Sequence, residues 1–156
     1  MNKVIVPAVL SAGLIALTFG AASAAEKKTV TYENTIKKIQ DERCLACHGP
    51  DSPTIEEFDK DKAGFKKKMK GPSMDTYENL MVFVNGSDAG AIMRRLDDGK
   101  STKDGKPGNM YAYLADDDKE RAEHLAKFKK WIGSWNLKKR KELTEAELKA
   151  VKAPKK

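Results

Sequence analysis

The stretch Cys44-Leu45-Ala46-Cys47-His48 constrains this chain more than any other feature of its sequence. Its thiols are the only two cysteines, so no other pair is available for a disulfide framework. A structural zinc site takes four ligands, commonly in two separated pairs, whereas the sequence holds only one further histidine, His124. A thioredoxin-type redox pair lies where a strand meets a helix, and no segment shows convincing strand alternation.

The same spacing is the attachment signature of a c-type haem. One short helical turn places both sulfur atoms against one edge of a porphyrin, where each forms a thioether to a vinyl group. The side chain that follows at once then reaches the iron. The motif therefore predicts one covalently bound haem c, held by Cys44 and Cys47, with His48 as an iron ligand.

The first residues have the pattern of an export signal. A basic start at residues 1–3 precedes a nearly continuous apolar or small run at 4–19, and Ala22-Ser23-Ala24 supplies the small-x-small pattern that signal peptidase reads. The rival interpretation is an uncleaved anchor, because residues 4–25 are just long enough to span a bilayer of about 30 Å. Proline and glycines within the run disfavour an anchor. We expect a signal peptide at 1–24 and a periplasmic mature protein.

The composition predicts a thin apolar core. Aromatic residues make up 7% of the chain and charged residues 34%, with a formal net charge of +7. A haem brings a large rigid apolar body around which short helices can pack. We therefore expect one domain that needs its cofactor to fold.

Apolar spacing and helix-end signals predict an all-α chain. Residues 54–72, rich in lysine, are expected as a solvated loop or frayed helix, 99–109 as a loop, and the lysine-rich end as a tail. Thr31 is expected to cap the first helix and Gly133 to end the clearest one. The predicted helices are 32–43, 75–85, a short helix from 87 or 88 to about 98, 117–132, and a last short helix with a capping box at Thr144 and Glu147.

With the motif placed after the first helix, the chain resembles the class I c-type cytochromes with a single haem. In that family a helix leads into CxxCH, a methionine in a distant loop is the sixth ligand, and a C-terminal helix packs across the N-terminal one. The resemblance covers about residues 30–135. It implies an all-α, cytochrome c-like fold around one covalently attached haem at 25–136, followed by a basic extension, 137–156, with a short helix.

The resemblance also implies a sixth ligand, for which Met110 is the best candidate. It lies in the loop Pro107-Gly108-Asn109-Met110-Tyr111, just before the C-terminal helix, where the family places its ligand. The alternative is a loop methionine packed on the haem edge. Met74, in the bend after Gly71-Pro72-Ser73, is the second candidate. The remaining methionines of the mature chain are expected as core or surface residues: Met69, Met81 and Met93.

Two further residues bear on the surroundings of the haem. In the family, a proline carbonyl near the motif accepts the other ring N–H of the histidine ligand, and this role is carried to Pro50. His124 would give a bis-histidine haem, but its charged neighbours favour a surface position.

These features predict a periplasmic carrier of single electrons that is a monomer and not an enzyme. A haem-containing electron-entry subunit of an enzyme complex, docked through residues 137–156, and a haem protein with an open sixth position remain alternatives. Nucleic acid is not an expected partner, and contact of the basic tail with anionic lipid stays open. Two lysine-rich clusters indicate either solvated faces or attraction to acidic redox partners: Lys60, Lys62, Lys66, Lys67, Lys68 and Lys70, and Lys138, Lys139, Arg140 and Lys141.

Overall fold

The computed structural model describes residues 29–156, and these residues form helices without any strand. The all-α prediction is therefore confirmed over this range, while the predicted signal peptide lies outside the described residues. No helix of this part is long and apolar enough to cross a membrane. The α-helices are α1 (Lys37–Arg43), α2 (Leu45–His48), α3 (Ile55–Lys60), α4 (Lys62–Lys67), α5 (Tyr77–Val84), α6 (Ala91–Leu96), α7 (Asp118–Ile132) and α8 (Glu145–Lys149); η1 (Tyr32–Ile36) is a π-helix, and η2 (Tyr111–Leu114) and η3 (Arg140–Glu142) are 3₁₀-helices.

The helix ends follow from local side-chain chemistry. Thr31 accepts a hydrogen bond from the Asn34 N–H and begins η1, as predicted. Asp117 accepts from the Glu120 N–H in the same way at the start of α7. Gly133 ends α7 with φ +77°, a left-handed conformation that glycine adopts without strain. These ends are set by residues within one turn, and the sequence predicted those at Thr31 and Gly133.

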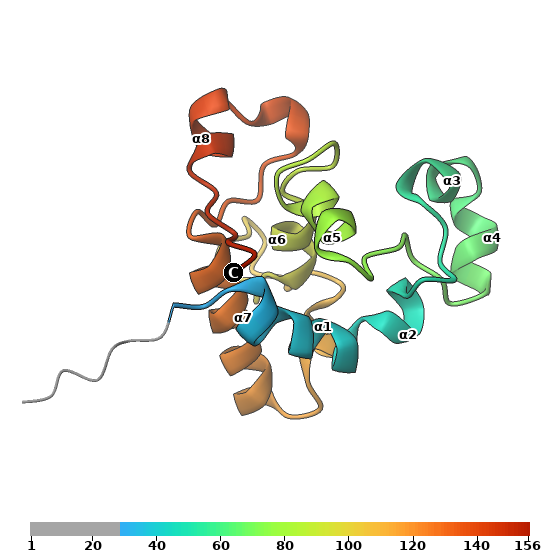
Figure 1. Ribbon diagram of the computed structural model, residues 1–156, viewed down its shortest axis with the longest axis horizontal. Coiled ribbons are helices and arrows are strands. Elements are labelled where there is room, and N and C mark those ends of the chain that lie inside the picture. The colour runs from blue at the N-terminus through green and yellow to red at the C-terminus, as the bar shows by residue number, and fades with distance from the viewer. Residues whose placement is uncertain (1–28) are drawn as a thin grey trace, which may run out of the picture.

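The core lies where α7 packs against η1, so the N-terminal and C-terminal helices meet as expected (Figure 1). Ile36, Phe128 and Trp131 are fully buried in one apolar cluster. At the other end of this contact, Arg43 forms ion pairs with Asp116 and Glu120 across the two helices. Because Arg43 directly precedes Cys44, these ion pairs hold the start of the CxxCH turn near the C-terminal helix.

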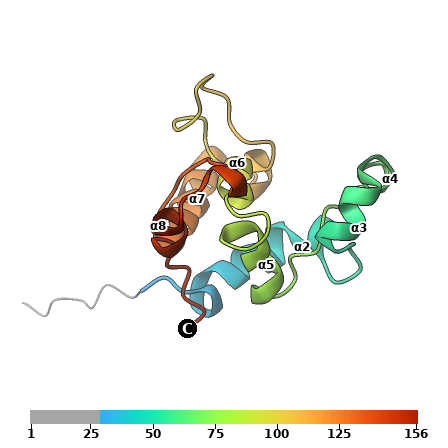
Figure 2. The same cartoon turned by 90° about the horizontal axis from the view of Figure 1, so that it is seen from above.

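Helices α3 and α4 project to one side of the molecule, away from α7 and α8 (Figure 2). The expectation of a loop or frayed helix at 54–72 is thus wrong in part, because two capped helices form there. Thr54 and Asp61 cap them through their side chains, and the rings of Phe58 and Phe65 stack with centroids 6.1 Å apart. Side-chain caps and one aromatic pair thus stabilise α3 and α4, which have no buried apolar face.

The end of the chain does not form a free tail, which corrects the prediction. Ala153 is fully buried, and its N–H donates to the Trp131 carbonyl at 3.0 Å. The Pro154 carbonyl accepts both the Tyr32 N–H and the Trp131 indole N–H at 2.9 Å. The last residues therefore join η1 to α7, and basic composition alone did not reveal this pairing. The domain boundary predicted at residue 136 stays a prediction.

Candidate haem site

The predicted haem-attachment residues lie in one tight turn. The Cys44 carbonyl accepts the N–H of Cys47 at 3.2 Å and of His48 at 3.0 Å, so α2 follows directly on α1. Both thiols are free rather than joined in a disulfide. Burial raises the pKa of the Cys44 thiol to about 11, which keeps that sulfur neutral at physiological pH.

The His48 ring is held by a segment far away in the sequence. Its Nδ1 lies 2.7 Å from the carbonyl oxygen of Pro72, 24 positions later. A carbonyl can only accept, so Nδ1 carries the proton and Nε2 keeps a free lone pair. Burial, the largest effect, lowers the pKa of His48 and favours this neutral form. The assignment of this carbonyl to Pro50 is wrong, because the chain turns away after Gly49 while residues 71–74 return beside the ring.

The returning segment fits against the ring at Gly71. A Cβ at this position would lie 2.1 Å from the His48 Cε1, so only glycine fits there. Backbone bonds hold the segment on both sides, from the Gly71 N–H to the Cys47 carbonyl at 2.8 Å and from the Met74 N–H to the His48 carbonyl at 2.9 Å. The Gly71-Pro72 pair was visible in the sequence, but nothing local to it indicated which ring it would meet.

Met110 lies at the end of a loop that is fastened to the end of α6. Its N–H donates to the Arg95 carbonyl at 2.9 Å, and the Gly108 N–H donates to the Asp97 carbonyl at 2.8 Å. A Cβ on Gly108 would lie 2.3 Å from the Arg95 carbonyl oxygen, so the close approach requires glycine. The Met110 side chain is half-buried against the apolar core.

Arg95 holds the side chain of Asn109, the residue before Met110, a role that sequence reasoning missed. Its guanidinium donates to the Asn109 Oδ1 at 2.8 Å. After burial and the Pro72 hydrogen bond, the positive charge of Arg95 is a further influence on the pKa of His48, which it lowers. Arg95 therefore adds a positive charge beside the Met110 loop.

The other methionines occupy different surroundings. Met74 is buried and is tied through its backbone to the His48 carbonyl, on the same side as the ring. Met93 is 2% exposed on α6 and Met81 is half-buried on α5, as expected for core residues. Met69 is 75% exposed.

His124 is buried, which corrects the prediction of a surface position. Only 6% of the residue is exposed, and its Nδ1 lies 2.7 Å from the Leu114 carbonyl oxygen. Position 124 shares its helix face with Phe128, one turn later, and that face is the buried one. Its charged sequence neighbours point elsewhere, so they were a poor guide. The ring connects α7 to η2, directly after Met110.

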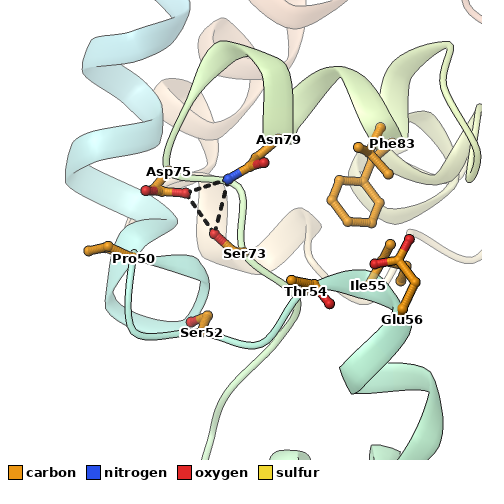
Figure 3. A pocket seen from close by; sticks show the side chains of 10 residues that line it. Pro50, Ser52, Thr54, Ile55, Glu56, Ser73, Asp75, Asn79 and Phe83 are labelled. Carbon is orange, nitrogen blue, oxygen red and sulfur yellow. Dashed lines mark hydrogen bonds between the residues drawn. The ribbon is translucent and has the colours of Figure 1, made fainter.

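A hydrogen-bonded network beside the site fixes the segment that follows Pro72 (Figure 3). The Ser73 hydroxyl donates to Asp75 at 2.6 Å and the Asn79 amide donates to it at 2.8 Å, and the first of these bonds contributes most to lowering the pKa of Asp75. The adjacent pocket, of about 350 Å³, includes none of the predicted haem ligands. It is lined by Pro50, Ser52, Thr54, Ile55, Glu56, Ser73, Asp75, Asn79, Val82 and Phe83.

The residues fit a covalently attached haem. Two free thiols and one neutral imidazole lie within a single turn, and the imidazole has its Nδ1 occupied and its Nε2 available. Gly71 leaves the ring room that any side chain would fill. This donor set and this fold define a monohaem c-type cytochrome.

Comparison with known proteins specifies the family. The model of the PccH cytochrome c family matches residues 31–154, so the chain belongs to this family. The chain is similar to the solved structure of the monoheme cytochrome PccH from Geobacter sulfurreducens, with 46% identity over 81% of this chain and 99% of that chain, and a TM-score of 0.76. No curated protein matches.

Family membership gives the cofactor and the general role. The chain is a haem electron carrier with one covalently bound haem c. The family match also continues well past residue 135, where the resemblance was expected to end. The buried Ala153 and the hydrogen bonds of Pro154 give the physical reason, because the last residues complete the contact between the terminal helices.

Proposed function

We propose that the mature chain shuttles single electrons in the periplasm, with thioethers at Cys44 and Cys47 and with His48 and Met110 as the two iron ligands. The observation that carries this proposal is the fixed His48 ring. The Pro72 carbonyl accepts the Nδ1–H, and Gly71 packs beside the Cε1 atom of the ring. Nε2 is therefore the only ring nitrogen left for a metal. The export pattern at 1–24 supports the periplasmic location.

The choice of Met110 over Met74 depends on which side of the ring each residue occupies. A second iron ligand would have to come from a segment other than the one that holds His48. Met74 is fastened to the His48 backbone and follows the Gly71–Pro72 segment that already occupies the histidine side. Met110 enters from a separate loop, which backbone hydrogen bonds and the Arg95–Asn109 hydrogen bond fasten to α6.

The protein's own contribution is positioning and exclusion of water. Bound haem supplies a one-electron iron couple. The Pro72 carbonyl orients the imidazole and increases its basicity through the Nδ1–H bond. The closely packed core around Phe128 and Trp131 keeps the surroundings unchanged between oxidation states, so little reorganisation accompanies electron transfer. We propose redox proteins as partners, a monomeric state, and no catalytic activity of its own.

Voltammetry of the holoprotein tests this function. We expect one reversible one-electron wave for the wild type and a potential lower by on the order of 0.1 V in Met110→Ala, because a methionine ligand raises the potential and axial ligands set it over about 0.8 V. Met74→Leu is the control and should leave the potential close to that of the wild type. An unchanged potential in Met110→Ala, or a large fall in Met74→Leu, contradicts the ligand assignment.

A further inference from the structure

The turn that ends α4 exposes an apolar side chain in an unusual backbone conformation. We call residues 66–70 the Met69 tip. Met69 is 75% exposed, and among the described residues only Tyr113 is a comparably exposed large hydrophobic side chain. Its φ is +55°, in the left-handed region that normally favours glycine. Met69 therefore combines a strained backbone with a solvent-exposed side chain.

Lysines surround Met69 in the sequence on both sides. Lys66, Lys67 and Lys68 are exposed and Lys70 is half-buried. None of the four forms an ion pair with another described residue, whereas nearby Lys62 pairs with Asp59 at 2.9 Å. The tip thus presents four uncompensated positive charges around one apolar group.

Along the sequence of this helix pair, carboxylates are more frequent near the start and lysines near the end, although Lys60 belongs to α3 and Asp61 caps α4. Glu56, Glu57 and Asp59 lie on α3, near the start of the pair, and the lysine run lies at its end. Lys66 and Lys67 are in the last turn of α4, where positive charge is favourable beside the helix dipole. Lys68 and Lys70 lie beyond the helix, so the dipole does not account for them.

The tip is directly connected to the candidate haem ligand. The Lys70 N–H donates to the Phe65 carbonyl at 2.9 Å, which closes the turn. The next residue, Gly71, contacts the His48 ring, and Pro72 accepts its Nδ1–H. A partner seated on the tip is therefore within a few residues of the iron ligand, through backbone that is hydrogen-bonded throughout.

These features break local stability rules in one place. A non-glycine residue with positive φ and a run of like charges each oppose folding, and an exposed methionine gains nothing from burial. Sites where several such rules are broken together are expected where function requires them. An apolar centre with a charged rim is also the arrangement typical of protein–protein interfaces.

We infer that the Met69 tip is the docking surface for an acidic redox protein, which presents carboxylates to the lysines and an apolar spot to Met69. This inference rests on the proposed electron-carrier function. A protein fits better than an anionic membrane, because the acidic residues of α3 on the same helix pair would be repelled by a continuous anionic surface. In the complex, one electron passes from one protein to the other, so the donor centre is oxidised by one electron and the acceptor centre is reduced by one electron.

Charge neutralisation with a matched control tests the lysines. The tip variant is Lys66→Gln, Lys67→Gln, Lys68→Gln and Lys70→Gln, and the control is Lys138→Gln, Lys139→Gln, Arg140→Gln and Lys141→Gln, which removes the same number of charges. The probe is a reduced acidic flavodoxin, which loses one electron as the oxidised holoprotein gains one. At about 20 mM ionic strength we expect about tenfold slower bimolecular transfer in the tip variant only, and convergence of the rates at about 0.5 M salt.

Substitution of the apolar group separates contact from steering. Met69→Asn tolerates the left-handed backbone but removes the apolar contact, so we expect weaker flavodoxin binding with little change in its salt dependence. Tyr113→Ser removes the other exposed hydrophobic side chain and should leave binding unchanged. Equal weakening by both substitutions would overturn the assignment to Met69.

The remaining outcomes also decide the matter. Equal slowing in both charge variants shows that only net charge matters and overturns the inference, as does the wild-type rate in the tip variant. Binding to phosphatidylglycerol vesicles that is lost in the tip variant, with an unchanged flavodoxin rate, assigns the tip to a membrane instead. Voltammetry without a partner separates the two proposals, because a reversible wave in every variant keeps the carrier function even where docking fails.

Discussion

The two candidate ligands are held by different kinds of structure. His48 is gripped by a distant backbone segment, with one hydrogen bond to Pro72 and a contact that only Gly71 allows. Met110 is half-buried and depends on the pairing of its loop with the end of α6. The contacts that fix His48 are made by its ring. The contacts that fix Met110 are made by the backbone of its loop and not by its side chain. A change that loosens the fold should therefore release Met110 from the iron before it releases His48.

The largest effect is expected at Gly71, on the firmly held side. Gly71→Ala places a Cβ 2.1 Å from the His48 ring, so either the ring or the segment must move. We expect a loss of at least about 1–3 kcal/mol in the free energy of unfolding, and a weakened histidine–iron bond. Chemical denaturation and the visible spectrum of the holoprotein measure both. Gly105→Asn, at an exposed glycine with no neighbours in reach of a Cβ, is the control, and equal losses would contradict the account.

Gly108→Ala should displace the Met110 loop and leave the contacts of His48 intact. Its Cβ would lie 2.3 Å from the carbonyl oxygens of Arg94 and Arg95, which forces the loop away from α6. We expect the reduction potential to fall as in Met110→Ala, with covalent haem and the His48 ligand retained. Voltammetry and pyridine haemochrome analysis check this outcome. Loss of the histidine ligand together with methionine would show that the two sides are not independent.

Asp97 adds a pH dependence to the methionine side. It is fully buried and accepts hydrogen bonds from the Trp135 indole at 2.9 Å and from the Gly99 and Ser101 N–H groups. Burial alone would raise the pKa of Asp97, but these donors outweigh it and hold the pKa below its ordinary value. The ionised form therefore stabilises the fold above the unfolded-state pKa of about 3.9, and this stability is lost as the pH falls through the folded-state pKa.

Asp97→Asn is expected to remove that contribution. At pH 7 the variant should be about 1.5–3 kcal/mol less stable, the range for hydrogen bonds to a charged group. The difference should narrow as the pH falls below about 4. Denaturation curves across this range measure it, with Asp51→Asn at an exposed position as the control. A difference that stays constant with pH would show that the Asp97 charge plays no part.

The smallest effect is expected at Arg95, which holds Asn109 in the Met110 loop. Arg95→Gln removes an exposed hydrogen bond to Asn109 and one positive charge near His48. We expect a loss of about 0.5 kcal/mol in stability and a slightly lower reduction potential, because removing positive charge favours ferric iron. Lys103→Gln, on the exposed loop, serves as the comparison. A rise in potential would contradict the placement of Arg95 beside the site.

Features of the site could be predicted from the sequence when the residues that determine them lie close together along the chain. The thiols and His48 lie within one turn, and Thr31, Asp117 and Gly133 set helix ends within a few residues, so local patterns were sufficient. The contact of Pro72 with His48 joins residues 24 positions apart. Pro50 is the proline nearest to the motif in the sequence, and only the packed chain shows that Pro72 takes the role.

The same reasoning explains the errors at His124 and at the C-terminal end. His124 was assigned from its charged neighbours, whereas burial follows the helix face that it shares with Phe128. Ala153 lies among lysines, but its N–H and the Pro154 carbonyl complete hydrogen bonds between the terminal helices. Composition reports the average surroundings of a segment and does not identify the few residues that pair.

Near-infrared magnetic circular dichroism of the ferric holoprotein tests the His48–Met110 assignment most directly, because it reports the pair of axial ligands. The account predicts a histidine–methionine signature in the wild type and in Met74→Leu, and its complete loss in Met110→Ala. A histidine–methionine signature that persists in Met110→Ala, or a bis-histidine signature in the wild type, would contradict it.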